Sequence, residues 1–174
     1  KSLFQPTSDE HYAEEMSKFI GSDHRKVVLN HSDLAEALKE SMISRDLPGM
    51  ADIDSSLLLF CKEIRKDFVV GLSGECADEI FGGYPWFTRD EMFYLDTFPW
   101  SRFVNNRIEI VNDKLKNMPI KELVRSQYEK SLSKVPHLEN ESKRDYRLKE
   151  ISYLNLKWFM VNLLNRTDRV SMYN

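Results

Sequence analysis

The chain has 174 residues, of which 41% are hydrophobic and 30% are charged, and its formal net charge is −3. This length suffices for one hydrophobic core but is short for two ordinary domains. The composition excludes collagen-like, low-complexity and wholly disordered classes, and without a basic excess it argues against a nucleic-acid partner.

The first predicted element is a helix that ends near residue 20. Ser8 or Asp9 can act as its N-cap, and Gly21 lies directly after its end. One apolar face would be formed by Tyr12, Met16 and Phe19. The β-branched run at residues 26–29 then predicts a short strand.

Two more helices and a second strand are predicted next. One helix begins with Ser32 as its candidate N-cap and ends before Pro48 and Gly49. The other covers roughly residues 54–66. Its candidate N-caps are Asp54, Ser55 and Ser56. The run FVVGL at residues 68–72 is typical of a strand covered on both faces, and it would pair in parallel with the first strand because helices lie between them.

The second half of the chain predicts mainly helices. Residues 84–100, rich in aromatic side chains, predict an irregular link. Helices follow at about 100–118 and from Pro119 to about residue 135, and then a loop at 136–140. The pattern at 141–165 predicts a helix that is apolar on most of its circumference. If nothing covers this last helix, we expect it to support a homo-oligomer.

The two ends and the cysteines add expectations about the setting of the protein. The chain begins without Met and stops just after the last apolar pattern, so we expect a fragment of a longer protein. Cys61 and Cys76 are too few for a disulfide framework, which favours the cytoplasm. The charge-free runs are far shorter than the roughly 20 residues of a membrane-spanning helix, so no membrane partner is expected.

The stretch from residue 69 to residue 84 has the strongest potential for chemistry. Glu75, Asp78 and Glu79 have helical i, i+3, i+4 spacing, and Ser73 precedes them after the predicted strand. Such clustered acids are stable together when Mg²⁺ or a cationic partner neutralises them, and the turn can bind phosphate or ribose oxygens. Alternatively, acids in a first helical turn and a serine cap simply stabilise a helix. Spacing alone leaves both interpretations open.

Residues 73–84, SGECADEIFGGY, resemble the SGExxDExFGGY signature of the glutamine-dependent asparagine synthetases. Residues 163–172 (LLNRTDRVSM) and 48–56 (PGMADIDSS) resemble two other segments of that family. The resemblance implies an α/β, mostly helical fold: part of an adenine-nucleotide alpha-hydrolase-like (PP-loop ATPase) domain with one or two parallel strands. It also implies that residues 1–174 are a fragment of the synthetase domain, without the PP-loop (SGGxDS) and without the glutaminase domain.

The resemblance further implies an ATP-dependent ligase that requires Mg²⁺. Such an enzyme adenylates aspartate to β-aspartyl-AMP and transfers ammonia derived from glutamine to form asparagine. By motif position, Ser73 and Gly74 would contact AMP, Glu75 would support formation of the intermediate and accept a proton from ammonia, and Asp78 would bind Mg²⁺ on the pyrophosphate. Supporting or pocket-lining roles would fall to Glu79, Asp54, Ser55, Arg166, Asp168 and Arg169.

Two alternative functions remain open at this point. The chain could be a non-catalytic binding or assembly module, or part of a related amidotransferase that adenylates another carboxylate. For Arg166 and Arg169 the alternative to anion binding is an ordinary ion pair. If the site is catalytic, Glu75 and Asp78 should face a common, solvent-reachable cleft. Without the PP-loop, we expect the isolated chain to be inactive.

Overall fold

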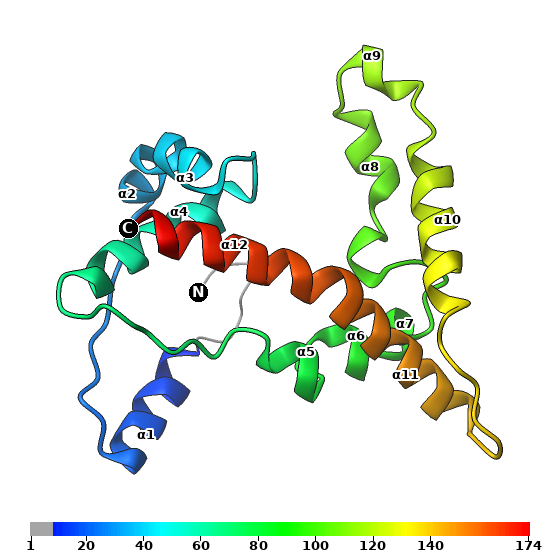
Figure 1. Ribbon diagram of the computed structural model, residues 1–174, viewed down its shortest axis with the longest axis horizontal. Helices are drawn as coiled ribbons and strands as arrows, with labels where there is room; N and C mark the ends of the chain where they lie inside the picture. The colour runs from blue at the N-terminus through cyan, green and yellow to red at the C-terminus, as the bar shows by residue number, and fades with distance from the viewer. Residues whose placement is uncertain (1–8) are drawn as a thin grey trace. The chain divides into compact units, whose positions relative to one another are not determined.

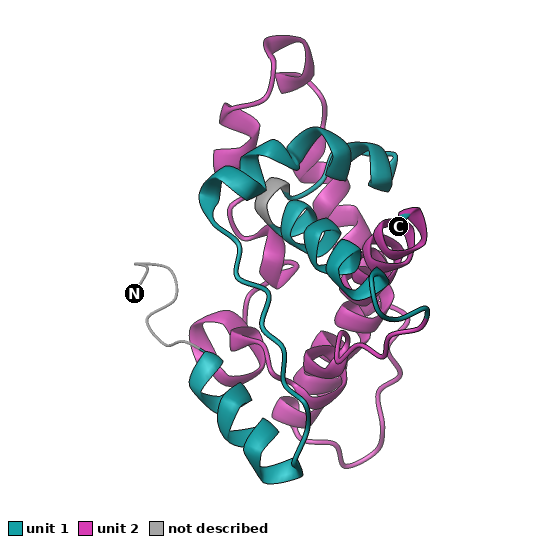
Figure 2. Cartoon of the chain, turned by 90° about the vertical axis from the view of Figure 1, so that its left-hand side faces the viewer, with its two compact units in different colours: residues 1–69, 174 teal, residues 70–173 magenta. Residues whose placement is uncertain are grey.

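A computed structural model describes residues 9–174, and the regular secondary structure of this part of the chain is entirely helical (Figure 1). The chain divides into two compact units (Figure 2). Unit 1 extends to residue 69 and includes Asn174, and unit 2 comprises residues 70–173. The mostly helical character is confirmed, whereas the one or two parallel strands are absent from the described residues.

The described part of unit 1 contains four helices. They are α1 (Glu10–Ile20), α2 (His31–Glu36), α3 (Leu38–Arg45) and α4 (Ala51–Arg65). The helix predicted first is confirmed as α1, and Gly21 ends it with a left-handed backbone at φ 68°. Asp9 occupies the N-cap position without a side-chain capping bond, and Ser8 lies outside the described residues. The apolar face of Tyr12, Met16 and Phe19 is exposed, with Phe19 86% accessible.

The helix predicted from Ser32 is in fact two helices, and it begins elsewhere. Asn30 is the N-cap of α2, because its side chain accepts a bond from the Asp33 amide (3.0 Å) and the Asp33 carboxylate accepts one from the Asn30 amide (2.9 Å). This reciprocal capping box begins the helix two residues earlier than expected. The chain then passes through Ala37 into α3, and both helices pack against α4.

Helix α4 begins at residue 51, so the expected caps lie inside it. Asp54 instead accepts a bond from Arg45 (2.8 Å), and both side chains are buried. Ser55 is fully buried, 3.3 Å from the hydroxyl of Ser41. These four polar side chains therefore join α3 and α4, and Asp54 and Ser55 do not cap a helix.

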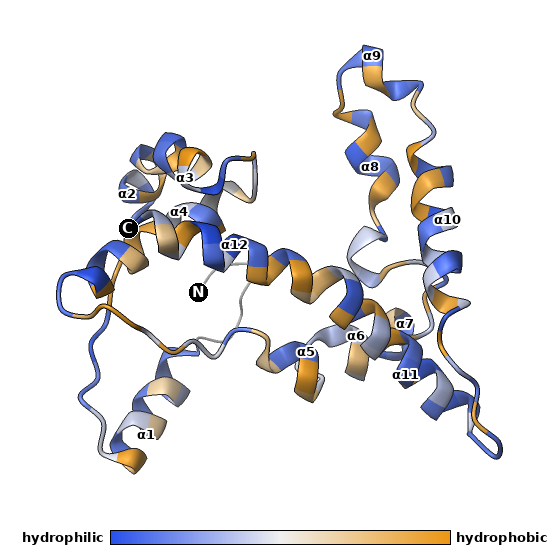
Figure 3. Cartoon of the chain, viewed as in Figure 1, coloured by the Kyte–Doolittle hydropathy of each residue, from blue (hydrophilic) through white to orange (hydrophobic). Residues whose placement is uncertain are grey.

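Neither predicted strand is formed. Residues 26–29 and 68–72 have no regular structure, and in the second run Val69 and Val70 are 85% and 79% exposed. Figure 3 shows the hydrophobic character of this segment, which leads into α5 (Ala77–Phe81). A strand needs a neighbour for its backbone hydrogen bonds, and no partner strand exists in the described residues. The placement of the acidic residues at a strand end is therefore wrong for this structure.

Unit 2 contains α5 and nine further helical elements. They are α6 (Pro85–Thr88), α7 (Asp90–Phe93), the 3₁₀ turn η1 (Pro99–Ser101), α8 (Val104–Glu109), α9 (Asp113–Lys116), α10 (Ile120–Leu132), α11 (Lys143–Leu154), the π-helical η2 (Asn155–Phe159) and α12 (Met160–Tyr173). Figure 1 shows α8 beside α10 with α9 at their tip, and α11, η2 and α12 as one continuous rod.

The aromatic link at 84–100 proves to be structured, and it supplies most of the core of unit 2. Prolines begin its helical turns at α6 and η1, as expected for a residue with fixed φ and no amide hydrogen. One buried cluster consists of Trp86, Phe87, Met92, Phe93 and Ile151. A second consists of Phe98, Tyr128 and Leu154. The expected irregular link is therefore wrong, because these rings bury large apolar surfaces against α10 and α11.

The helix predicted at 100–118 is broken into α8 and α9. Asn112 interrupts it, because its side chain accepts a bond from the Lys114 amide (3.0 Å) and caps α9. Ile110, at the end of α8, is 87% exposed. The next two predictions are confirmed: α10 follows Pro119, and residues 136–140 form a loop.

The last predicted helix is confirmed but is longer and less uniform than expected. Ser142 caps it by accepting a bond from the Asp145 amide (3.1 Å), and it continues through η2 to Tyr173. Ile151 and Leu154 are fully buried, whereas Val161 and Leu164 are 55% and 50% exposed. These apolar residues are thus packed where they lie on α11 and open where they lie on α12. Among the described residues, no helix is long and apolar enough to cross a membrane.

Candidate active site

The acidic signature forms a tight loop followed by the one-and-a-half turns of α5. The Ser73 hydroxyl accepts a bond from the amide of Glu75 (3.1 Å). Cys76 has a left-handed backbone at φ 76°, which is uncommon for a residue with a side chain. Gly82 ends α5 at φ 74°. Strain of this kind is retained where neighbouring structure fixes the backbone, as at ligand-binding loops.

The carboxylate of Glu75 is held by two consecutive residues of α12. Its Oε1 accepts a hydrogen bond from Nη2 of Arg166, and its Oε2 accepts one from Oγ1 of Thr167. The side chains of Glu75 and Arg166 are only 20% and 11% exposed, so this ion pair is shielded from water and salt far better than a surface pair. Two segments about ninety residues apart in the sequence are thereby joined.

The carboxylate of Glu79 has a different environment from that of Glu75. Glu79 is buried, and its Oε1 accepts a 2.6 Å bond from the hydroxyl of Tyr84. The Tyr84 ring stacks on Trp86 at 4.4 Å between centroids and meets Phe159 edge-on at 5.3 Å. Burial, and then the Glu79 carboxylate, raise the pKa of Tyr84, so its hydroxyl remains a donor. This bond anchors the end of the signature loop in the aromatic core.

Asp78 is the exposed member of the acidic group. A Cβ added to Gly83 would lie 2.0 Å from Oδ1 of Asp78, so only glycine lets the carboxylate fold over the backbone at that point. The three acids therefore do not share one metal: among the described residues, no three His, Cys, Asp or Glu side chains form a group that could hold an ion. A single free carboxylate does fit Mg²⁺, because this ion commonly uses one or two protein carboxylates and completes its shell with phosphates and water.

The nucleotide candidates Ser73 and Gly74 lie on the open side of the loop. Both are exposed, and a Cβ added to Gly74 would meet no atom within 4 Å. Because the Ser73 oxygen accepts from the Glu75 amide, its own hydrogen is available to a ligand oxygen. The backbone of Gly74 can be approached closely by a phosphate or a ribose.

The remaining candidates of α12 lie beside the Glu75 contacts. Asp168 is exposed, and Arg169 is half-buried. The structure thus joins Glu75 with Arg166 directly and places Asp168 and Arg169 within the following turn of the same helix. Arg166 therefore forms an ion pair, which was one of its two predicted roles. Its partner is Glu75, the carboxylate that is the catalytic candidate.

Asp54 and Ser55 belong to unit 1 and lie apart from this group in the chain. Asp54 lines a pocket of about 220 Å³ together with Leu38, Ser41, Met42, Pro48 and Gly49. A Cβ on Gly49 would come within 1.9 Å of the Asp54 carboxylate and 2.1 Å of the Arg45 guanidinium. The buried Arg45–Asp54 pair therefore occupies the space over Gly49. Glycine at this position leaves room for that pair, which is a structural role within unit 1.

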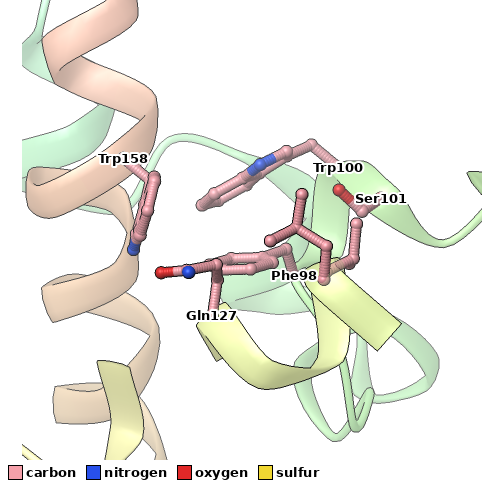
Figure 4. A pocket seen from close by; sticks show the side chains of 7 residues that line it. Phe98, Trp100, Ser101, Gln127 and Trp158 are labelled. Atoms are coloured by element: carbon pink, nitrogen blue, oxygen red, sulfur yellow. The ribbon is translucent and has the colours of Figure 1, made fainter. Parts of the chain in front are cut away.

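A second pocket, of about 250 Å³, lies in unit 2 away from the acidic residues. Its walls are Phe98, Trp100, Ser101, Leu123, Val124, Gln127 and Trp158. Figure 4 shows Trp158 opposite the residues of the η1 turn, with Gln127 of α10 below them. Glu75 and Asp78 line neither of these two pockets, so their expected common cleft stays a prediction.

Sequence reasoning missed two residues of the site. Thr167 was overlooked because a threonine between charged residues has no distinctive pattern. The sequence indicates Tyr84 only as the end of the signature and as a member of the aromatic-rich link. Its position five residues after Glu79, beyond the glycine pair, was the available signal for the bond between them.

Comparisons with known proteins agree on one family. Residues 2–174 match the family model described as "Asparagine synthase". The chain is 49% identical over 172 residues to "Asparagine synthetase [glutamine-hydrolyzing] 3" of Bacillus subtilis (strain 168). The aligned residues are 98% of the chain and 28% of that relative. "Asparagine synthetase [glutamine-hydrolyzing]" of Mus musculus is 35% identical over 79 residues, 43% of the chain and 14% of the relative. The chain thus spans less than a third of the relatives that it matches.

Proposed function

The chain belongs to the asparagine synthase family, and from this premise we propose that it is part of an ATP-dependent, amide-forming ligase. The proposed enzyme adenylates the side chain of aspartate, releases pyrophosphate and lets ammonia from glutamine displace AMP. Aspartate and glutamine are proposed because the Bacillus relative is named as a glutamine-hydrolysing asparagine synthetase. The cytoplasm is the proposed location.

The observation that carries this proposal is the fixed position of Glu75. Its two oxygens are bound by Arg166 and Thr167, and each oxygen retains a lone pair that can accept a further bond. An ionised carboxylate in this state can accept a hydrogen bond from ammonia and then its proton. In the proposed step a C–N bond forms at the aspartyl carbonyl, the C–O bond to AMP breaks, and one ammonium proton passes to Glu75.

The other loop residues have separate tasks in the proposal. The Ser73 hydroxyl and the Gly74 backbone bind AMP on the open side of the loop. Asp78 holds Mg²⁺, which when bound offsets the negative charge of the pyrophosphate. Glu79 does not meet the substrate, because its carboxylate is buried and bound to Tyr84; its task is to hold the loop. Arg169 and Asp168 support the same end of the site, and Asp54 and Ser55 support α3 and α4.

The test uses the full-length protein with ATP, Mg²⁺, aspartate and either glutamine or ammonia. Pyrophosphate, AMP and asparagine are measured for the unchanged protein and for Glu75→Gln and Asp78→Asn. We expect both variants to lose at least about 100-fold in rate. Glu129→Gln is the matched control, because Glu129 also pairs with an arginine, Arg125, but is 58% exposed on α10.

Two outcomes would contradict the proposal. Undiminished asparagine formation in both variants would favour a non-catalytic role for the signature, as in a binding or assembly module. Pyrophosphate release that depends on Glu75 but requires a different carboxylic acid would identify a related amidotransferase instead.

A further inference from the structure

Thr167 is the one uncharged donor that binds the Glu75 carboxylate in the described residues. It follows Arg166 on α12, so two successive side chains of one helix bind the two oxygens of one carboxylate. Thr167 is itself half-buried. A contact of this kind is specific in direction, because a hydroxyl donates along a single O–H bond, whereas a guanidinium offers several donors.

The loop itself does little to orient the Glu75 side chain. Glu75 lies in a turn outside α5, and its backbone amide donates a local hydrogen bond to the hydroxyl of Ser73. A glutamate has three side-chain torsions, and one ion pair with a flexible arginine leaves the plane of the carboxylate free to turn. A second donor on the other oxygen removes this freedom and fixes which lone pairs face away from α12.

We propose that Thr167 is a positioning residue for the reaction, which holds the Glu75 carboxylate in the orientation that receives the proton from ammonia. This inference rests on the proposed function, because it assigns Thr167 to the same catalytic carboxylate. Loss of the hydroxyl lowers kcat for amide formation by about 10- to 100-fold, the size of effect that a small misplacement of a reacting group produces. The KM for aspartate changes little, since Thr167 touches Glu75 and not the substrate.

The experiment compares Thr167→Val with Thr167→Ser in the full-length protein. Valine has the shape of threonine without the hydroxyl, and serine keeps the hydroxyl without the methyl group. We expect the valine variant to show the fall in kcat and the serine variant to recover most of it, with ammonia as the nitrogen donor so that the glutaminase step is bypassed. Thr88→Val is the matched control, because the Thr88 hydroxyl also donates a bond, to the Pro85 carbonyl (3.4 Å), at an exposed position.

A second measurement reports on the contact without turnover. In protein labelled with ¹³C-glutamate, the infrared band lost in Glu75→Gln belongs to the Glu75 carboxylate. We expect Thr167→Val to shift this band and Thr167→Ser to leave it in place. If Thr167→Val shifts the Glu75 band but the unchanged protein forms no amide, Thr167 positions Glu75 and the proposed function is overturned. Unchanged kcat and an unchanged band in the valine variant would overturn the inference, as would equal losses in valine and serine.

Discussion

At the scale of single residues, the bond between Tyr84 and Glu79 decides how the signature loop ends. Glu79 is 3% exposed, and within the described structure its second oxygen, Oε2, is buried without a hydrogen-bond partner. The carboxylate therefore depends on the hydrogen bond that its Oε1 accepts from the Tyr84 hydroxyl at 2.6 Å. A buried acid with a single donor is a sensitive point of the fold.

We expect Tyr84→Phe to destabilise the protein by about 1–3 kcal/mol, because it leaves a buried carboxylate without its donor. The free energy of unfolding is measured by urea titration at pH 7. Tyr94→Phe is the control, since Tyr94 is 56% exposed. The difference in the free energy of unfolding between Tyr84→Phe and the unchanged protein should shrink above pH 10. Burial and Glu79 raise the pKa of Tyr84 in the folded protein, whereas the unfolded tyrosine ionises near pH 10, so the unchanged protein loses stability as the pH rises further. Equal stability of Tyr84→Phe and the unchanged protein would contradict this role.

Cys76, in the middle of the loop, carries a thiol whose pKa is raised by burial and then by the charges of Glu79 and Glu75. A raised pKa keeps the thiol protonated at neutral pH, and the thiolate is the reactive form. Cys76 is therefore expected to be a slow nucleophile in spite of its place in the signature.

In the Cys61→Ser variant, Cys76 should react with an aromatic disulfide reagent more slowly at pH 7 than free cysteine does. The rate should rise as the pH passes 9, because the thiol then ionises. Replacing Glu79 with Gln should increase the rate at pH 7 by removing one repelling charge. A reaction as fast as that of free cysteine at pH 7 would show that the loop does not protect this thiol.

At the scale of elements, Arg147 joins three helices of unit 2. This buried side chain of α11 donates to the carbonyls of Phe93 (2.8 Å) and Leu95 (2.6 Å). Phe93 is the last residue of α7, and Leu95 lies just after that helix. It also donates to the hydroxyl of Tyr128 on α10 (3.0 Å) and to Glu150 (2.9 Å). The planar guanidinium, with its five donors, is suited to four partners in different directions.

Arg147→Met should cost about 3–5 kcal/mol of stability, because it removes the donor of the Phe93 carbonyl and of the nearly buried Glu150 carboxylate, and leaves the Leu95 carbonyl with the Tyr128 hydroxyl alone (3.3 Å). Urea unfolding followed by tryptophan fluorescence provides the measurement. Arg144→Met is the matched control on the same helix, since Arg144 is 60% exposed and lies 3.5 Å from Asp90. A loss of less than 1 kcal/mol for Arg147→Met would show that the helices pack without this link.

At the scale of the whole molecule, the proposed reaction needs more phosphate-binding groups than the signature loop supplies. The loop supplies the Glu75 carboxylate, the Ser73 hydroxyl and the exposed Asp78 carboxylate. The sequence contains no SGGxDS segment that could bind the triphosphate. Pyrophosphate release needs several donors and cations around the leaving oxygens. Large apolar side chains are also exposed at residues 68–72 and on α12, a surface that favours association.

We therefore expect the isolated 174-residue chain to form no asparagine from ATP, Mg²⁺, aspartate and ammonia, and to associate as its concentration rises. Pyrophosphate release and sedimentation velocity test the two statements separately. Val161→Lys, on the exposed stripe of the last helix, should reduce the association if that stripe is the contact. Steady turnover that is abolished by Glu75→Gln would show instead that the chain is a complete catalyst.

The sequence by itself determined the features that depend on local rules. Helix α1 ends at Gly21 because glycine adopts the left-handed backbone, and α10 begins directly after its N-cap residue Pro119 because proline lacks the amide hydrogen that an interior helical position needs. The signature at 73–84 identified the family, and Glu75 was its main candidate, because such motifs are encoded in consecutive residues.

Only the tertiary structure decided which distant groups meet. The runs at 26–29 and 68–72 have the composition of strands, but pairing requires a neighbour that composition does not supply. The aromatic residues of 84–100 became the core of unit 2 because α10 and α11 offer them a surface. Thr167 gained its role for the same reason: the hydroxyl has no distinctive sequence pattern, and its importance comes from the Glu75 carboxylate that the fold brings beside it.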